Sequence, residues 1–395
     1  MEGNGNIARI LVIGIGGGGG NAVNAMVKED IKEVEFLALN TDKQALSGVN
    51  AKRLAIGEKL TKGLGAGANP EIGRQAAEES RDVIQGLMEG ADLVFIAAGM
   101  GGGTGTGAAP VVAQIARELG ILTVAVVTKP FNFEGPRRMK HAEMGIDNLK
   151  GNVDALVIVQ NEKLNRAKDF SIKDAFTKAD EVLMQGILGI TEIVTQNGRI
   201  NLDLADVKCA MRDSGMAHMG IGEGKGKNKT IDAIRKAVYS PLSETTIQGA
   251  SNLMIYFRGS EDLTLEEVSL GVQLVRQVIS PNANVLFGVG FDDNLKDEVR
   301  VTLIATGFSG GNDGKAAFFS SEAATQAAAD NVKRRAETPV QEMNPVDAIS
   351  RQTVQQNSSN IFGASTQHAS SEPLSGNVSV DEDKNIPPFL RKMKG

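Results

Sequence analysis

Short apolar segments alternate with amphipathic ones over the first 160 residues of the chain. The apolar segments are hydrophobic at successive positions, as in parallel strands buried on both faces. They cover 7–13, 34–39, 93–98, 122–127 and 155–159. Of the intervening helices, one is predicted to begin at Asn69-Pro70, and another to carry Pro110 in its first turn and end at Gly120. This alternation predicts an α/β fold, a Rossmann-like domain with a parallel sheet covered by helices.

A long amphipathic segment and a second mixed pattern follow. From Ser171 onward, apolar residues recur at helical spacing, which predicts a long central helix. Between 207 and 308 the pattern predicts a second, smaller α/β domain. Its expected helices lie near 229–239 and 264–279, and its expected strands near 252–258, 284–290 and 299–306.

The composition changes after Phe308 to Gly, Ser, Asn, Gln and Ala with few large apolar residues. Such a segment buries too little surface to offset the entropy of ordering, so we expect 311–380 to be a disordered linker. An apolar cluster returns at Ile386 to Leu390 between charged flanks, which indicates a docking peptide or, alternatively, a frayed terminus. The expected divisions are 1–170, 171–205, 206–310, 311–380 and 381–395.

Composition excludes several classes of function. No apolar run is long enough for a membrane span, and the first residues carry no secretory signal, so we expect a cytoplasmic protein. The net charge of −6, without a basic stripe, argues against a nucleic-acid partner. The three His and the single Cys209 are too few and too scattered for a zinc site or a Cys–His dyad, so we expect no metal held by protein side chains alone.

Glycine is the outlier in composition, at 46 residues, and it clusters after two predicted strands. The first cluster runs from Gly14 to Gly20 and is followed by Asn21. It satisfies the pattern G-x-G-x-x-G, with Asp42 placed roughly where a ribose-binding carboxylate would lie. A nicotinamide-dependent oxidoreductase is therefore one open interpretation, and a plain tight turn is another.

The second cluster, Gly99 to Gly107, contains Thr104 and Thr106. Two glycine-rich turns between strand and helix in one sheet indicate two backbone cradles for one polyphosphate, with the threonine hydroxyls available to phosphate oxygens. An oxidoreductase has no need for the second turn. The chain also lacks the G-x-x-x-x-G-K-[ST] pattern of Walker-type NTPases.

The string GGGTGTG in this turn resembles the signature loop of the tubulin and FtsZ family. Further segments resemble the bacterial branch of that family in the same order along the chain: GIGGGGGNAVN, NTDKQAL, TKGLGAGANPEIGR, FIAAGMGGGTGTGAAPVVA, TVAVVTKPFNFEGPRR, NLDLADV and IPPFLR. The resemblance implies a GTPase that binds GTP and GDP with Mg²⁺ and polymerises head to tail into filaments of the division ring at mid-cell. It also implies that the peptide 386–391 binds adaptors such as FtsA, through which contact with the membrane is indirect.

The resemblance also assigns site residues. On a helix face, Phe176 and Asp180 would meet the base, since a carboxylate accepts from the N1 and N2 donors of guanine; packing in a core is the alternative for Phe176. The run Gly135-Pro136-Arg137 departs slightly from the basic residues usual at this place in the family, so the role of Arg138 is less defined than that of the glycines. The implied nucleotide-binding residues are Gly17, Gly18, Gly19, Gly20, Asn21, Gly101, Gly102, Gly103, Thr104, Gly105, Thr106, Gly107, Glu134, Arg138, Phe176 and Asp180.

Hydrolysis requires a group that orients the attacking water, and the glycine turns offer none. The resemblance assigns this role to the segment with Asn201, Asp203 and Asp206, acting on the nucleotide of the next subunit. Read without the family, the aspartates indicate a helix cap. A nucleotide-binding scaffold without turnover is therefore also open.

Overall fold

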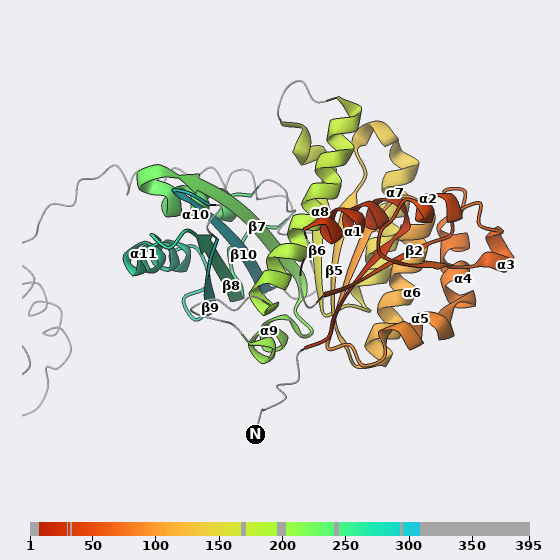
Figure 1. Cartoon of the computed structure of the whole chain (residues 1–395), viewed down its shortest axis with the longest axis horizontal. Coiled ribbons are helices and arrows are strands. Elements are labelled where there is room, and N and C mark those ends of the chain that lie inside the picture. The colour runs from red at the N-terminus through yellow and green to blue at the C-terminus, as the bar shows by residue number, and fades with distance from the viewer. Residues whose placement is uncertain are drawn as a thin grey trace, which may run out of the picture. The chain divides into compact units, whose positions relative to one another are not determined.

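The computed structural model describes residues 8–29, 31, 34–166, 171–195, 203–240, 245–292 and 295–308. Its ten strands form one sheet in the order β3-β2-β1-β4-β5-β6-β7-β10-β8-β9 (Figure 1). The strands are β1 (Ile10–Ile15), β2 (Val34–Asn40), β3 (Lys52–Ala55), β4 (Leu93–Gly99), β5 (Leu122–Lys129), β6 (Ala155–Gln160), β7 (Gly215–Lys225), β8 (Ala250–Gly259), β9 (Asn284–Phe291) and β10 (Glu298–Phe308).

Helices cover both faces of this sheet. The α-helices are α1 (Gly16–Lys28), α2 (Lys43–Ser47), α3 (Glu58–Thr61), α4 (Pro70–Glu79), α5 (Arg81–Met88), α6 (Thr104–Glu118), α7 (Pro136–Lys150), α8 (Ile172–Thr195), α9 (Leu204–Met211), α10 (Lys229–Val238) and α11 (Leu265–Arg276). Short 3-10 helices are η1 (Asn132–Glu134), η2 (Asn161–Arg166) and η3 (Gly226–Asn228).

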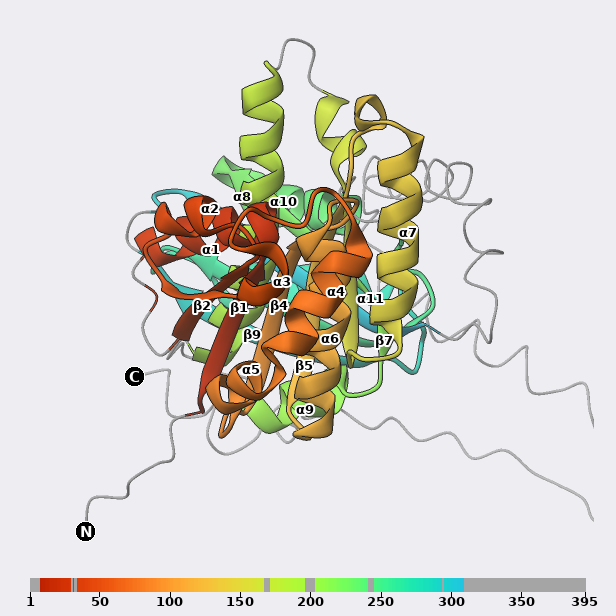
Figure 2. The same ribbon diagram turned by 90° about the vertical axis from the view of Figure 1, so that its right-hand side faces the viewer.

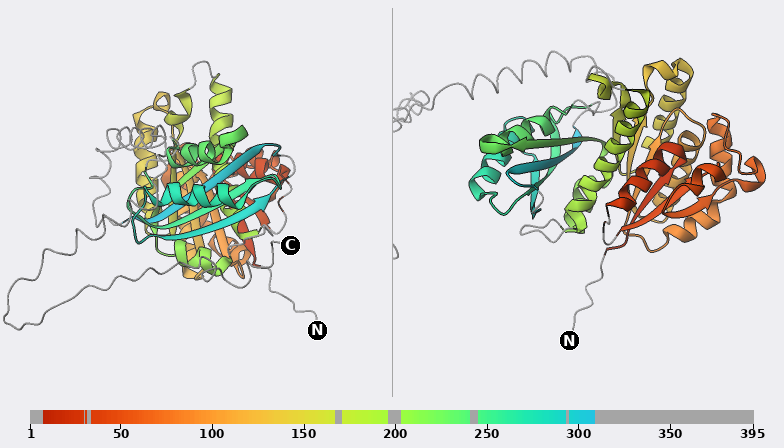
Figure 3. Two further views of the ribbon diagram at one scale, coloured as in Figure 1. Left: turned by 90° about the vertical axis from the view of Figure 1, so that its left-hand side faces the viewer. Right: turned by 45° about the horizontal axis from the view of Figure 1, so that its top comes forward.

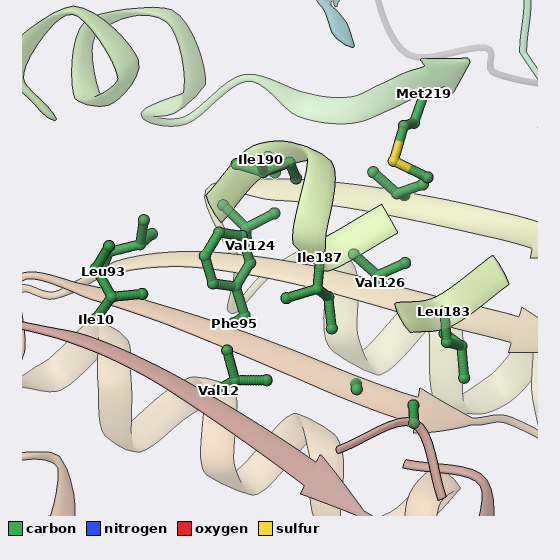
Figure 4. Packing of buried hydrophobic residues seen from close by; sticks show 14 of the residues in the cluster. Ile10, Val12, Leu93, Phe95, Val124, Val126, Leu183, Ile187, Ile190 and Met219 are labelled. Atoms are coloured by element: carbon green, nitrogen blue, oxygen red, sulfur yellow. The ribbon is translucent and has the colours of Figure 1, made fainter. Parts of the chain in front are cut away.

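Strands β1 to β6 are parallel, and all but the edge strand β3 have apolar side chains on both faces. Ile10 and Val12 point to a core shared with α1 and α8, and Figure 4 shows Ile10 beside Leu93 in the cluster that includes Ile187 of α8. The intervening Leu11 and Ile13 point to the other face, where α4, α5, α6 and α7 pack (Figure 2). The predicted Rossmann-like parallel sheet is confirmed.

Strand β7 joins the two halves of the sheet. Residues 215–217 pair in parallel with β6, and 218–225 pair with the antiparallel β10. On one face of β8 and β10, α10 and α11 enclose a separate core, while Met254, Tyr256 and Ile304 on the other face join the core beneath α8 (Figure 3). The long helix α8 therefore packs against both halves.

Several predicted elements are confirmed, and some boundaries were wrong. All five predicted strands of the first half exist, as do the two helices and three strands predicted beyond residue 207. Pro110 does not lie in a first turn, because α6 begins at Thr104 and Pro110 is inside the helix. The sequence did not predict β3 or β7 as strands. The linker and the terminal peptide lie outside the described residues.

Candidate functional site

The two glycine-rich turns lie side by side at one edge of the sheet. They follow β1 and β4, which are adjacent and parallel, so both turns open at the carboxyl ends of these strands. From there α1 passes to one face of the sheet and α6 to the other, which makes this the point where the strand order reverses. Open α/β sheets bind their ligands in the crevice at such a point.

Most of the first glycine cluster is helical, because α1 begins at Gly16. Gly16 has a φ of +74°, a conformation that favours glycine. A Cβ on Gly14 would lie 2.2 Å from the carbonyl oxygen of Gly19, and a Cβ on Gly19 would lie 2.2 Å from that of Ala97. These glycines let the first turn of α1 lie directly against the strands, with its free N–H groups at the edge of the sheet.

The second turn packs in the same way. Gly101 has a φ of +100°, and a Cβ there would lie 2.9 Å from the carbonyl oxygen of Arg138. A Cβ on Gly103 would lie 2.8 Å from Ala66, and one on Gly107 would lie 1.9 Å from the Pro70 oxygen of α4. The second half of the glycine cluster forms the first turn of α6. Glycine at these positions lets α6 lie this close to α4.

The two turns touch each other, and each leaves one glycine facing open space. A Cβ on Gly16 would lie 3.0 Å from the amide nitrogen of Gly105. By contrast, a Cβ on Gly17 or on Gly102 would meet nothing within 4 Å. Packing within the protein does not require glycine at these two positions, which fits a close approach by a ligand.

The two threonines of the second turn differ in their surroundings. The Thr104 hydroxyl is half-buried and lies 2.7 Å from the Thr41 hydroxyl. The Thr106 hydroxyl is buried and accepts a hydrogen bond of 2.8 Å from the Gly101 N–H. Thr106 therefore stabilises the turn from inside, and its contact with a phosphate stays a prediction.

Asn21 and Asp180 lie beside the first turn. Asn21 Nδ2 donates a hydrogen bond of 3.1 Å to Asp180 Oδ2 of α8. Burial raises the pKa of Asp180 to about 6, and this hydrogen bond lowers it in part. Hydrogen-bond donors on a ligand, such as the N–H groups of guanine, would stabilise the ionised form of this carboxyl group.

Three phenylalanines gather at the start of α8. Phe176 contacts Phe131 edge-on at 5.4 Å between ring centroids and Phe133 at 6.2 Å, and Phe131 stacks on Phe133 at 5.2 Å. Phe131 is buried, whereas Phe133 and Phe176 are exposed. The cluster thus presents aromatic surface on which a base can stack.

Glu134 and Arg138 form an ion pair within the segment that follows β5. Glu134 Oε1 also accepts a hydrogen bond of 2.9 Å from the Phe131 N–H. The pair therefore fixes the segment that carries the aromatic cluster, and Arg138 also meets Gly101 through its carbonyl oxygen. The Arg138 side chain itself is half-exposed.

The acidic segment lies at the opposite edge of the sheet. Asp203 caps α9 and accepts a hydrogen bond of 2.7 Å from the Asp206 N–H, so the capping role is confirmed. Lys208 of α9 is 3.5 Å from Asp92, which directly precedes β4, and Arg212 donates to the Gly120 carbonyl just before β5. The seven residues of β4 span about 20 Å, so the structure separates Asp206 from the glycine turns. Figure 2 shows α9 at the bottom of the sheet. Asn201 lies outside the described residues.

The sequence did not predict all of the residues that lie beside the two glycine turns. Asn40, Ala45 and Val49 line a hollow together with Gly17 and Asn21. Ala66 and Asn69 lie against Gly103. The segments NTDKQAL and TKGLGAGANPEIGR were the available signal. Asp42, considered as a ribose ligand, instead caps α2 by accepting from the Gln44 and Ala45 N–H groups, which weakens the oxidoreductase interpretation.

Comparisons with known proteins agree with this geometry. The model of the tubulin/FtsZ family GTPase domain matches residues 9–169, and that of the FtsZ family C-terminal domain matches residues 215–309. An FtsZ dimer from M. jannaschii, solved empty, is 46% identical over 76% of this chain and 89% of its own, with a TM-score of 0.74. A point mutant of M. jannaschii FtsZ is equally similar, with 91% of its own chain covered.

A more distant structure shares the fold. CetZ2 from Haloferax volcanii, solved as a protofilament with GTPγS bound, is 20% identical, with a TM-score of 0.66 over 82% of this chain and 99% of its own.

Proposed function

The chain belongs to the tubulin/FtsZ family and is a guanine-nucleotide-binding GTPase of the cytoskeletal type, and from this premise we propose that it assembles head to tail into filaments. Each GTPase site would be completed by the acidic segment of the next subunit. One observation carries this proposal: Asp206 and the glycine turns lie at opposite edges of one sheet. A contact between unlike surfaces that does not close on itself generates a filament.

In this proposal, different residues of the chain bind the phosphates, bind the base and orient the attacking water. The N–H groups of the glycine turns bind the polyphosphate, and Gly17 and Gly102 let it approach the backbone. Asp180 accepts from guanine, and the exposed rings of Phe133 and Phe176 stack on the base. Asp206 of the neighbour, exposed and without a described side-chain partner, orients the attacking water at the γ-phosphate.

Magnesium fits this site only as an ion bound to the phosphates of the nucleotide. In the described part of the chain, no group of three or more His, Cys, Asp or Glu side chains could hold a metal ion. Mg²⁺ commonly keeps water ligands and binds to nucleotide phosphates. It would supply neutralising charge there, and the half-buried Thr104 of the second turn would supply a hydroxyl to such a phosphate.

The proposal includes a cellular role. Filaments of this kind would form the division ring at mid-cell, as the FtsZ relationship suggests. No helix in the described ranges is long and apolar enough to cross a membrane. Peptide 386–391 would bind an adaptor such as FtsA, and deletion of 381–395 should abolish adaptor binding but leave polymerisation intact.

A mixing experiment tests the shared site. One chain carries Asp206→Ala, and the other carries Gly102→Val, chosen because Gly102 faces open space and the change leaves the packing of the turn intact. Each variant alone should hydrolyse GTP poorly, and a mixture should recover turnover because one interface combines an intact pocket with an intact acidic segment. Gly86→Val, at an open position on α5, is the matched control. A mixture no faster than its components would overturn the shared site.

A further inference from the structure

Thr41 lies behind the second glycine turn, directly after β2. It is fully buried, at 0% exposure, and its Oγ1 is 2.7 Å from Oγ1 of Thr104, the first residue of α6. Thr104 is only half-buried, so of the two residues it is the one that a ligand at the turn can reach. Within the described ranges, Thr104 is the hydrogen-bond partner of the Thr41 hydroxyl.

The backbone around Thr41 fixes its position. The Thr41 carbonyl oxygen accepts hydrogen bonds from the Gly65 N–H, at 3.1 Å, and from the Thr61 hydroxyl, at 3.3 Å. The next residue, Asp42, caps α2. Thr41 therefore connects the end of β2, the segment around Gly65 and the start of α6.

Each hydroxyl has a single proton, and this decides the direction of the hydrogen bond once a phosphate is present. If Thr104 donated to Thr41, the buried Thr41 proton would lack an acceptor, and Thr104 would offer only lone pairs to the phosphate. Phosphate oxygens accept and do not donate, so this arrangement is unfavourable. If Thr41 donates to Thr104, the Thr104 proton is free to point at the phosphate, and every group is satisfied.

We infer that Thr41 is a positioning residue, whose buried hydroxyl turns the proton of Thr104 toward a phosphate oxygen of the guanine nucleotide. This inference rests on the proposed contact of Thr104 with the nucleotide. Thr41 itself does not touch the ligand and acts only through Thr104. Its contribution should therefore disappear when Thr104 loses its hydroxyl.

A double-mutant cycle in the full-length chain tests the inference. Thr41→Val removes the hydroxyl and keeps the volume, whereas Thr41→Ser keeps the hydroxyl. Affinity for GTP and GDP is measured by displacement of a fluorescent guanine nucleotide, at protein concentrations too low for assembly. We expect Thr41→Val to weaken binding about three- to tenfold, from the net value of one hydrogen bond, and Thr41→Ser to stay within about twofold.

The Thr104→Val background separates the possible outcomes. Thr41→Val should cause no further loss there, because no hydroxyl is left to orient. An equal loss in both backgrounds, or a Thr41→Ser variant as weak as Thr41→Val, would show a structural role and overturn the inference. If Thr104→Val alone leaves affinity unchanged, the proposed contact of Thr104 is wrong. If Thr41→Val does not fold, Thr41→Ala takes its place in the same cycle.

Discussion

The side-chain amide of Asn21 donates a hydrogen bond of 3.1 Å to Asp180, and so joins the end of the first glycine turn to the long helix α8. The bond connects the phosphate-binding edge of the proposed site to the residue proposed to recognise guanine. It also lowers the pKa of a carboxyl that burial raises to about 6. The ionisation of Asp180 is therefore close to neutral pH, where it affects both stability and binding.

We predict that affinity for GDP decreases by about tenfold as the pH falls from about 7 to about 5. Guanine offers N–H donors, which require the ionised form of Asp180 as acceptor. Asp180→Asn should bind weakly at every pH in this range and show no such dependence. Displacement of a labelled guanine nucleotide checks this, with Glu181→Gln, which changes a neighbouring half-exposed carboxyl paired with Lys178, as the control. A pH profile for Asp180→Asn that parallels the wild type would contradict the assignment.

Stability should have the opposite dependence on pH. The folded pKa of Asp180, about 6, exceeds its ordinary value of 3.8, so between these values the native chain binds more protons than the unfolded chain. The contribution of this group to the free energy of unfolding is therefore fully present below about pH 4 and is lost as the pH rises through 6. Denaturant unfolding of Asp180→Asn should show a smaller decrease between these limits than the wild type.

The glycines of the two turns should separate into two classes. Gly14→Ala should destabilise the fold by about 1–3 kcal/mol, because its Cβ would lie 2.2 Å from the Gly19 oxygen. Gly17→Ala should leave stability unchanged or raise it by up to about 1 kcal/mol, since Gly17 is within α1 and faces open space. Its nucleotide affinity should nevertheless fall. Thermal unfolding and nucleotide titration measure the two effects, and a stable Gly17→Ala with normal affinity would remove this turn from the site.

The parts of the fold with a local hydrophobic signal were predictable from sequence, and β7 was not. Its glycines at 220, 222 and 224 have low strand propensity, yet a Cβ at each would lie 1.8 or 1.9 Å from a carbonyl oxygen of α10. The strand is glycine-rich because α10 lies directly on its backbone. That requirement is set by packing against another element, which strand propensity does not report, although glycine at every second position was a visible trace of it.

In the site, too, features with a local sequence motif were predictable and contacts between distant segments were not. The glycine turns and the cap at Asp203 follow from short motifs, and the structure contains both. The cluster of Phe131, Phe133 and Phe176 joins segments separated by about forty residues, and no local pattern pairs them. The Thr41–Thr104 contact is likewise tertiary, because it depends on two strands on either side of β1.

Asp203 and Asp206 should respond differently to substitution. Asp203→Asn keeps a good helix cap and should retain stability, whereas Asp203→Ala should lose about 1 kcal/mol. Asp206→Asn should lower GTP turnover by about a hundredfold without weakening nucleotide binding to the monomer. If Asp203→Asn loses turnover as severely as Asp206→Asn while remaining stable, Asp203 acts on the nucleotide as well as on the helix.

Arg258 of β8 should contribute more to stability than any exposed ion pair of the described chain. It contacts Glu192 of α8 at 2.5 Å and Asp292 at 2.7 Å, and the two carboxylates are each 15% exposed. Arg258→Ala leaves both without their shared cation, so we expect a loss of about 3 kcal/mol in the free energy of unfolding.

Burial already raises the pKa of Glu192, so this carboxyl can take up a proton when the cation is gone, and the loss should be smaller at acidic pH. Arg74→Ala, which breaks a half-exposed pair with Glu71, should cost much less, because solvent screens an exposed pair. Equal losses for the two variants in urea unfolding would show that the link between α8 and β8 does not depend on Arg258.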